Sequence, residues 1–181
     1  MEPIIPQPRA FIFGAGHISK SLSKVATLAG FETVIVDDRE QFASRDRFPE
    51  AGEVMAGEYE QIFPKLEVNA SSYLVIVTRG HRDDMRVLEW ALTTPARYVS
   101  MIGSKRKVLG VMKELEKHGT PRESFDRLFA PMGLDIGATS PEEIAVSVVA
   151  EMIAVRRNAP PAWRTLTKSI FQNPALKSVA K

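Results

Sequence analysis

The most constraining feature of the sequence is a glycine-rich turn between an apolar run and a segment with helical periodicity. Residues 10–13 (Ala-Phe-Ile-Phe) are apolar throughout, which is typical of a buried strand. From His17 to Ala29, apolar residues recur at helical spacing, and Gly30 stands where a helix commonly ends. A strand, a glycine turn and a helix in this order indicate the first unit of a parallel α/β sheet.

Strand and helix patterns then alternate along the chain. Further strands are predicted at 33–36, weakly near 54–55, at 73–78 and at 98–102, with helices near 82–92, 104–117 and 140–156. Because alternating elements favour parallel pairing with right-handed crossovers, we predict one doubly wound, Rossmann-like α/β domain of three layers. It should span residues 10–157, after an extended lead-in (1–9) and before a basic, proline-containing tail (158–181).

Composition narrows the class of protein. The chain has 181 residues, 44% of them hydrophobic, and no apolar run long enough to span a bilayer, so we expect one globular domain without a membrane segment. The N-terminus does not have the pattern of a signal peptide. The absence of cysteine excludes disulfides and thiolate metal sites, and fits a reducing compartment, so we expect a cytoplasmic protein without metal ligands.

Charge is unevenly distributed along the chain. Six basic residues and no acidic residue follow Glu151, which leaves 18 basic and 22 acidic residues in the chain up to and including Glu151. Nucleic-acid binding requires a basic surface on the folded body, and one short basic cluster does not supply it. We therefore expect no nucleic-acid partner.

The glycine turn is the first candidate binding site. Its residues are Gly14, Ala15, Gly16, His17, Ile18 and Ser19. The first glycine permits a tight turn, and the second lets backbone amides approach a phosphate at the helix N-terminus. Asp37 ends the second strand, 23 positions after Gly14, where a carboxylate can bind a ribose diol, and Asp38 follows it. Alternatively, the glycines only form a turn and one of these aspartates only caps the next helix.

A second set of polar residues follows the strand at 73–78. Thr78, Gly80 and His81 lie there, with Asp83 and Asp84 shortly after. In a doubly wound sheet this strand neighbours the first one, so His17 and His81 are expected to converge on one crevice. The alternative is that both histidines are ordinary solvated loop residues.

Two further segments are candidates. Gly103, Ser104, Lys105 and Arg106 begin a helix together with Lys107, and cations in a first turn oppose the helix dipole unless an anion is bound there. We predict a phosphate or other oxyanion site; a solvated basic turn is the alternative. Asp135 lies between two glycines in residues 133–137, a segment that either approaches the ligand or forms a tight connection.

Taken together, the motifs are similar to those of a known family. They are Phe13-Gly14-Ala15-Gly16-His17, Val36-Asp37-Asp38-Arg39, Thr78-Arg79-Gly80-His81, residues 102–107, residues 131–137 and residues 139–147. In this order they resemble the Rossmann-type C-terminal domain of the xanthine dehydrogenase accessory factors, the XdhC/CoxI family. The resemblance covers residues 10–157, and the blocks from Gly103 and from Pro131 are more specific than the glycine turn.

The resemblance implies an accessory factor that binds the molybdenum cofactor, assists its sulfuration with a cysteine desulfurase, and delivers it to a molybdenum hydroxylase. The family residues that it carries over are Gly14, Gly16, His17, Asp37, His81, Ser104, Lys105, Arg106 and Asp135; it assigns no catalytic residue. Family members commonly carry another domain with a cysteine that holds the cofactor. Because this chain has no cysteine, binding must use amides, cations and histidine, or a separate partner chain.

Three functions therefore remain open. The first is a cofactor-handling accessory protein, expected to form a homodimer, whose ligand is either the molybdenum cofactor or an NAD(P)-type dinucleotide. The second is a small NAD-dependent oxidoreductase with His17 or His81 as acid/base, although the sequence has no Tyr-x-x-x-Lys pair. The third is a regulatory domain that senses a nucleotide.

Overall fold

A computed structural model describes residues 7–159, which form a six-stranded, fully parallel sheet in the order β3-β2-β1-β4-β5-β6. The predicted doubly wound fold is thereby confirmed. Residues 1–6 of the lead-in and 160–181 of the tail lie outside the described residues. The strands are β1 (Arg9–Phe13), β2 (Glu32–Asp37), β3 (Glu53–Ala56), β4 (Tyr73–Ile76), β5 (Tyr98–Met101) and β6 (Leu128–Phe129). The helices are α1 (His17–Leu28), α2 (Tyr59–Ile62), α3 (His81–Thr93), α4 (Lys105–Lys117) and α5 (Pro141–Arg156), with 3-10 turns η1 (Phe63–Lys65) and η2 (Arg122–Arg127).

The first strand occupies the centre of the sheet. Phe13, at its end, is in register with Val36 of β2 on one side and with Ile76 of β4 on the other. The chain moves outward through β2 and β3, then returns to the other side of β1 through β4, β5 and β6. The strand order therefore reverses between β1 and β4, which is where open α/β sheets bind ligands.

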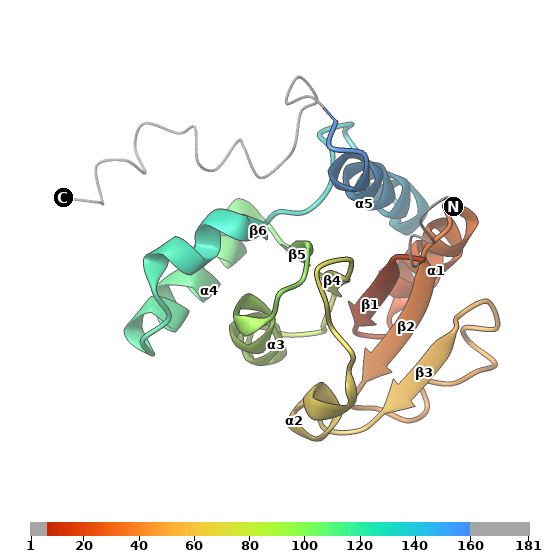
Figure 1. The fold of residues 1–181 in the computed structure, drawn as a ribbon, viewed down its shortest axis with the longest axis horizontal. Coiled ribbons are helices and arrows are strands. Elements are labelled where there is room, and N and C mark those ends of the chain that lie inside the picture. Colours follow the sequence, from red (N-terminus) through yellow and green to blue (C-terminus); the bar gives the residue numbers. More distant parts are fainter. Residues whose placement is uncertain (1–6, 160–181) are drawn as a thin grey trace, which may run out of the picture.

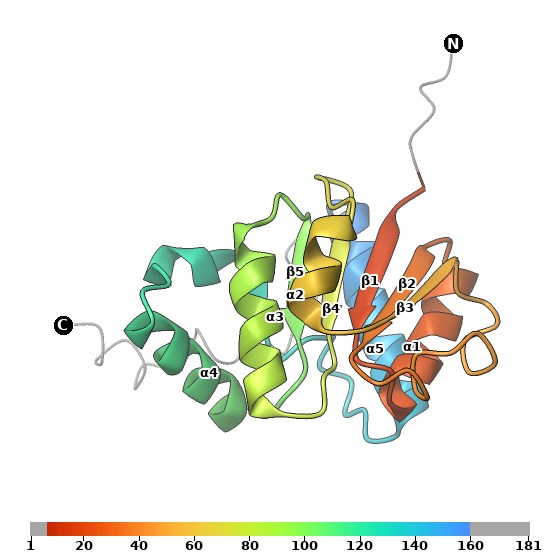
Figure 2. The same cartoon turned by 90° about the horizontal axis from the view of Figure 1, so that it is seen from below.

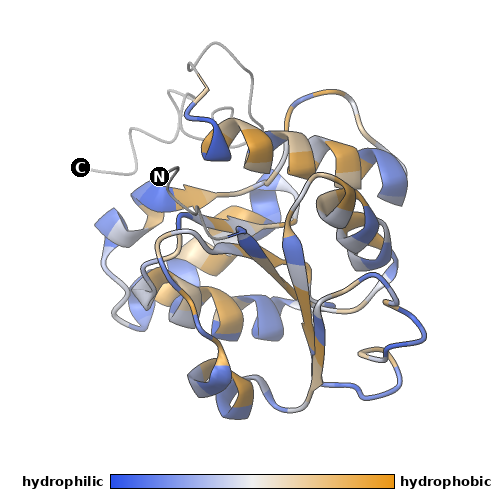
Figure 3. Cartoon of the chain, turned by 45° about the vertical axis from the view of Figure 1, so that its right-hand side comes forward, coloured by the Kyte–Doolittle hydropathy of each residue, from blue (hydrophilic) through white to orange (hydrophobic). Residues whose placement is uncertain are grey.

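Helices cover both faces of the sheet and create two apolar cores (Figure 1). Successive side chains of a strand point to opposite faces, so Phe11 and Phe13 pack with α2, α3 and α4, while Ala10 and Ile12 pack with α1 and α5. Because both faces are covered, the central strands are apolar throughout rather than alternating. Figure 3 shows the same division, with hydrophobic strands inside and hydrophilic segments on the outer helix surfaces.

Short-range signals define the helix starts. The Ser140 hydroxyl accepts from the amide of Glu143 at 3.2 Å, and the Glu143 carboxylate accepts from the amide of Ser140 at 3.0 Å, so that the two residues form a capping box. Ser104 likewise caps α4 through the amide of Lys107. His118 is the C-cap residue of this helix.

Two local features differ from the sequence-based expectation. The strand β6 and the turn η2 were not predicted, because β6 has two residues and no periodicity at that length. In addition, β4 ends at Ile76 rather than Thr78. The amide of Val77 still donates to the carbonyl of Phe13, but the chain then turns toward α3.

Within residues 7–159, no helix combines the length and apolarity needed to cross a membrane.

A buried carboxylate joins α5 to the sheet. Glu151 is fully buried, and its Oε1 accepts from the Tyr98 hydroxyl at 2.5 Å and from the amide of Gly133 at 2.9 Å. Its other oxygen has no hydrogen-bond partner among the described residues. Burial raises the pKa of Glu151 above its ordinary value of 4.5, although the two hydrogen bonds oppose this effect.

The raised pKa predicts a pH-dependent contribution to stability. As pH rises above the ordinary glutamate value, the unfolded chain loses the proton first, so the folded state loses relative stability. We expect Glu151→Gln to remove this loss, because glutamine keeps an acceptor oxygen for both donors and does not titrate. Urea unfolding at several pH values between about 5 and 8 should show the free energy of wild type falling relative to that of the variant as pH rises. A pH-independent difference would contradict the assignment.

Candidate functional site

Several candidate residues lie where the parallel strands end. There α1 begins after β1, α3 begins after β4, α4 begins after β5, and residues 130–140 pass from β6 to α5. In Figure 2, the start of α3 and the connection into α5 lie along the same edge, toward which the β1 arrow points. Segments that are far apart in the sequence therefore lie together at this edge of the sheet.

The two glycines of the turn have different physical roles. Gly14 has a φ of +103°, and a Cβ atom there would lie 2.2 Å from the Val77 carbonyl oxygen, so no side chain fits. Its amide donates to the Val36 carbonyl at 2.7 Å, which fixes the turn against β2. Around a Cβ at Gly16, by contrast, there is no atom within 4 Å. Gly14 is thus required by packing, while Gly16 leaves open space at the start of α1.

The carboxylate of Asp37 forms its hydrogen bonds with groups of the protein itself. Its side chain is 2% exposed. The carboxylate accepts from the Ala15 amide at 2.7 Å and from the amide, Nε and Nη2 of Arg39, each at 2.9 Å. Burial alone would raise the pKa of Asp37, but these hydrogen bonds outweigh burial and hold the pKa below its ordinary value. Four donors fill the acceptor capacity of a carboxylate, so in this arrangement Asp37 holds the turn rather than facing a ligand.

The first turn of α1 offers unsatisfied amides. Gly16 is the N-cap residue, no side chain caps the helix, and no acidic residue lies in its first turn. His17 is exposed, and Ile18 is half-buried. Ser19 is buried, and its hydroxyl has no hydrogen-bond partner among residues 7–159. Since the Ala15 amide is taken by Asp37, the amides open to an anion are those that follow it.

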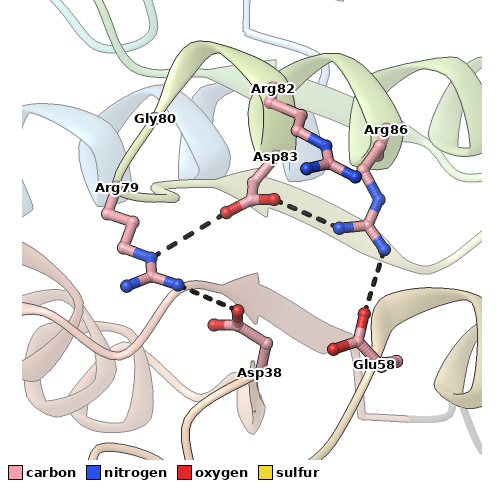
Figure 4. A pocket seen from close by; sticks show the side chains of 7 residues that line it. All are labelled: Asp38, Glu58, Arg79, Gly80, Arg82, Asp83 and Arg86. Carbon is pink, nitrogen blue, oxygen red and sulfur yellow. Dashed lines mark hydrogen bonds and ion pairs between the residues drawn. The ribbon is translucent and has the colours of Figure 1, made fainter.

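A polar pocket of about 410 Å³ lies between the residue that follows β2 and the start of α3. Its lining residues are Asp38, Glu58, Arg79, Gly80, Arg82, Asp83 and Arg86 (Figure 4). Sequence reasoning identified Asp38 and Gly80 there and placed Asp83 nearby, but it assigned no role to the three arginines or to Glu58. These residues come from three separate segments, and no short motif connects them.

Ion pairs organise this pocket. Arg86 contacts Glu58 at 3.2 Å and Asp83 at 3.3 Å, and it also pairs with Glu60. Arg79 reaches across the opening from the loop before α3 to Asp38, with Nη2 to Oδ2 at 3.0 Å (Figure 4). The charge of Arg86 is therefore compensated by several carboxylates, whereas Arg79 depends mainly on one.

Behind the pocket, a buried aspartate connects α3 with α4. Asp84 is fully buried, and it accepts from the Thr78 hydroxyl at 2.6 Å. Lys107 lies 2.5 Å from its other oxygen. One of the three cations predicted to hold an anion is therefore committed to Asp84, and Thr78 supports the loop rather than facing open space.

Lys105 and Arg106 remain available at the start of α4. Both are exposed, beside the half-buried Gly103, and neither has an ion pair within the described part of the chain. The imidazole of His81 lies against α4, 3.7 Å from where a Cβ on Gly110 would be. His17 and His81 begin helices on opposite faces of the sheet, and no contact joins the two rings in residues 7–159.

The segment with Asp135 is fixed by α5. The Gly133 amide donates to Glu151, and a Cβ on Gly133 would lie 2.4 Å from the Ser147 hydroxyl, so only glycine fits there. Ser147 also donates to the Leu134 carbonyl at 2.7 Å. Asp135 itself is exposed. The glycines thus make a tight connection onto α5 that presents Asp135 to solvent.

The contrast between the turn glycines is testable. Gly14→Ala should lower the free energy of unfolding by about 2 to 4 kcal/mol, because its Cβ meets a carbonyl oxygen and the backbone is left-handed. The matched variant Gly16→Ala should change it by less than about 1 kcal/mol, because the space is empty. Equilibrium urea unfolding measures both. Equal effects would show that the two glycines are not distinguished by packing.

Comparisons with known proteins identify the family of the chain. Residues 10–152 match the family model described as the XdhC Rossmann domain. A Bacillus subtilis (strain 168) protein, named as a probable subunit of xanthine dehydrogenase, is 31% identical over 157 residues, which cover 87% of this chain and 46% of that protein. The uncharacterized protein YqeB of Escherichia coli (strain K12) is 30% identical over 155 residues, covering 85% of this chain and 28% of YqeB.

A solved structure supports the same relationship. A crystal structure described as a xanthine dehydrogenase from Bacillus halodurans has a TM-score of 0.76 and 31% sequence identity, covering 87% of this chain and 45% of that chain. The chain therefore spans less than half the length of these relatives. The family model matches most of the chain, whose described residues form the parallel sheet of a Rossmann-like fold. This chain therefore belongs to the XdhC Rossmann domain family.

Proposed function

We propose that this domain serves the maturation of a molybdenum hydroxylase of the xanthine dehydrogenase type by holding a nucleotide-bearing cofactor where its strands end. The observation that carries the proposal is a set of unsatisfied donors on that edge. No side chain caps the first turn of α1, and the space beside Gly16 is open. Lys105 and Arg106 have no ion pair among residues 7–159. Helix N-termini and free cations are the groups that bind phosphate.

These donors fit the phosphate end of a cofactor. Amides and cations grip a diphosphate by charge-assisted hydrogen bonds and leave the distant reactive part of the molecule unaltered. The chain has no cysteine, so a molybdenum atom would not be held through a thiolate of this protein. Both the dinucleotide form of the molybdenum cofactor and an NAD(P)-type dinucleotide satisfy this description. When bound, the molybdenum cofactor supplies the redox chemistry of the client enzyme.

The names of the relatives suggest the client. One relative is named as part of a xanthine dehydrogenase, and a solved relative is described as a xanthine dehydrogenase. We propose that the domain, as a homodimer, docks such a hydroxylase, and that a cysteine desulfurase provides the sulfur for its cofactor. Co-expression with a xanthine dehydrogenase should then raise the specific activity of that enzyme. Unchanged activity and cofactor content would oppose a role in maturation.

The cations at α4 provide a direct test of ligand binding. Lys105→Ala combined with Arg106→Ala should weaken the binding of ADP, used as a diphosphate probe, about tenfold to a hundredfold, because charge-assisted hydrogen bonds are lost. Isothermal titration calorimetry measures this affinity, and native mass spectrometry after gentle purification shows whether a bound small molecule is lost as well.

The same helix supplies the matched control. Lys113→Ala with Lys117→Ala removes the same charge from exposed positions farther along α4, so ADP affinity should stay near the wild-type value. Equal loss in both double variants would show that only net charge matters. An absorbance change at the nicotinamide band with candidate substrates would instead favour the oxidoreductase alternative.

A further inference from the structure

The helix α5 is apolar on its outer side as well as on the side that packs against the sheet. Its inner residues, among them Val148 and Met152, are buried in the core. A surface helix usually carries polar residues on the opposite side, but here most of that side is apolar. Figure 3 shows α5, the uppermost helix in that view, in hydrophobic colours along most of its length. The outer face of α5 consists of residues at helical spacing that are exposed or half-buried: Glu143, Val146, Ala150, Ile153, Ala154 and Arg157.

The exposed apolar side chains of the domain lie on this helix or beside it. Among residues 7–159, three large hydrophobic side chains are exposed: Leu28 by 89%, Ile136 by 56% and Val146 by 50%. Leu28 ends α1, and the carbonyl that follows it accepts from Arg156 of α5 at 3.0 Å. Ile136 belongs to the connection that Ser147 of α5 holds by a hydrogen bond of 2.7 Å. Apolar side chains gathered in this way mark a protein interaction surface.

The charges of the outer face are placed symmetrically about Ala150. Glu143 precedes Ala150 by seven residues and Arg157 follows it by seven, which is about two helical turns in each direction. Glu143 uses Oε2 for the capping box, and its Oε1 has no hydrogen-bond partner among residues 7–159. Arg157 has no ion pair in the same part of the chain. The outer face is therefore an apolar strip with an acidic group at one end and a basic group at the other.

We propose that the outer face of α5 binds a second copy of this chain, with the two α5 helices antiparallel about a twofold axis near Ala150. Such an axis brings Glu143 of each copy beside Arg157 of the other, so the same contact forms twice, as a closed dimer requires. Val146 then packs against Ile153 of the other copy. Alanine at the axis lets the two helices approach closely, because the distance between helix axes depends on the side chains at the contact.

The flanks of α5 are complementary under the same axis. The flank that faces α1 bears Leu28 toward the end of α5, and α1 lies beside α5 in Figure 1. The other flank bears the connection with Ile136, which Ser147 holds before the centre of the helix. The axis exchanges both the flanks and the ends, so Leu28 of one copy approaches Ile136 of the other. A second copy thus covers all three exposed apolar side chains. The inference rests on the homodimer of the proposed function and assigns its contact surface.

Sedimentation velocity of the full chain at several concentrations tests the proposal. The wild type should sediment as a dimer that dissociates on dilution. Val146→Glu should raise the dissociation constant of the dimer at least about a hundredfold, because it buries two unpaired carboxylates in the contact. Since Val146 is exposed, urea unfolding should show the variant to be as stable as wild type. The matched control Lys113→Glu adds a glutamate at an exposed position of α4 and should leave the dimer unchanged.

A cross-link tests the position of the axis independently. The chain has no cysteine, so Ala150→Cys creates a single thiol in each copy. Mild oxidation should join the two copies by a disulfide, because Cβ atoms at a twofold axis approach to the distance that this bond requires. The product is a covalent dimer on a non-reducing gel. Lys113→Cys, on the exposed side of α4, should remain monomeric on the same gel.

The outcomes separate this proposal from the proposed function. A dimer that persists in Val146→Glu, or an Ala150→Cys variant that does not cross-link, would show that the copies meet at another surface. A wild type that is monomeric at every concentration contradicts the proposal outright, whereas ADP affinity and the activation of a hydroxylase still measure the role in maturation. If Val146→Glu abolishes that activation without changing sedimentation, the client enzyme covers this face and the proposal is wrong.

Discussion

The arrangement of the edge at which the strands end depends on the buried carboxylate of Asp37. A buried charge is costly unless it is fully hydrogen-bonded, and here donors from Ala15 and Arg39 satisfy it completely. Because Ala15 belongs to the turn after β1 and Asp37 ends β2, this interaction sets the position of the turn relative to its neighbouring strand. The start of α1, which follows Ala15 directly, is positioned by the same contact.

The sequence analysis predicted those features of the fold that short-range residue patterns determine. Helix starts at Ser104 and Ser140 depend on residues three positions apart, so they are visible in the sequence and the structure confirms them. The parallel pairing of the strands follows from the alternation of strands and helices along the chain. The strand β6 could not be predicted in this way, because two residues carry no periodicity and their pairing with β5 is a long-range contact.

The candidate site shows the limit of such reasoning more clearly. Sequence alone cannot decide between Asp37 and Asp38, because adjacent side chains face different surroundings and only packing shows which one is saturated. The sequence also does not show that Lys107 forms an ion pair with Asp84, which lies on another helix. Because of this ion pair, Lys107 does not contribute to an anion site with Lys105 and Arg106. The pocket of arginines and carboxylates likewise forms only when three separate segments meet.

The position of Glu151 has a mechanical consequence. One carboxylate oxygen receives hydrogen bonds from β5 and from the connection that precedes α5, so the helix, the sheet and that connection share a single fixed point. The opposite side of α5 includes Val146, which is 50% exposed. A protein bound on that outer side would contact the same helix whose Glu151 accepts the amide of Gly133, in the segment that presents Asp135. In this domain, α5 is therefore both a packing element of the sheet and the anchor of the loop that carries Asp135.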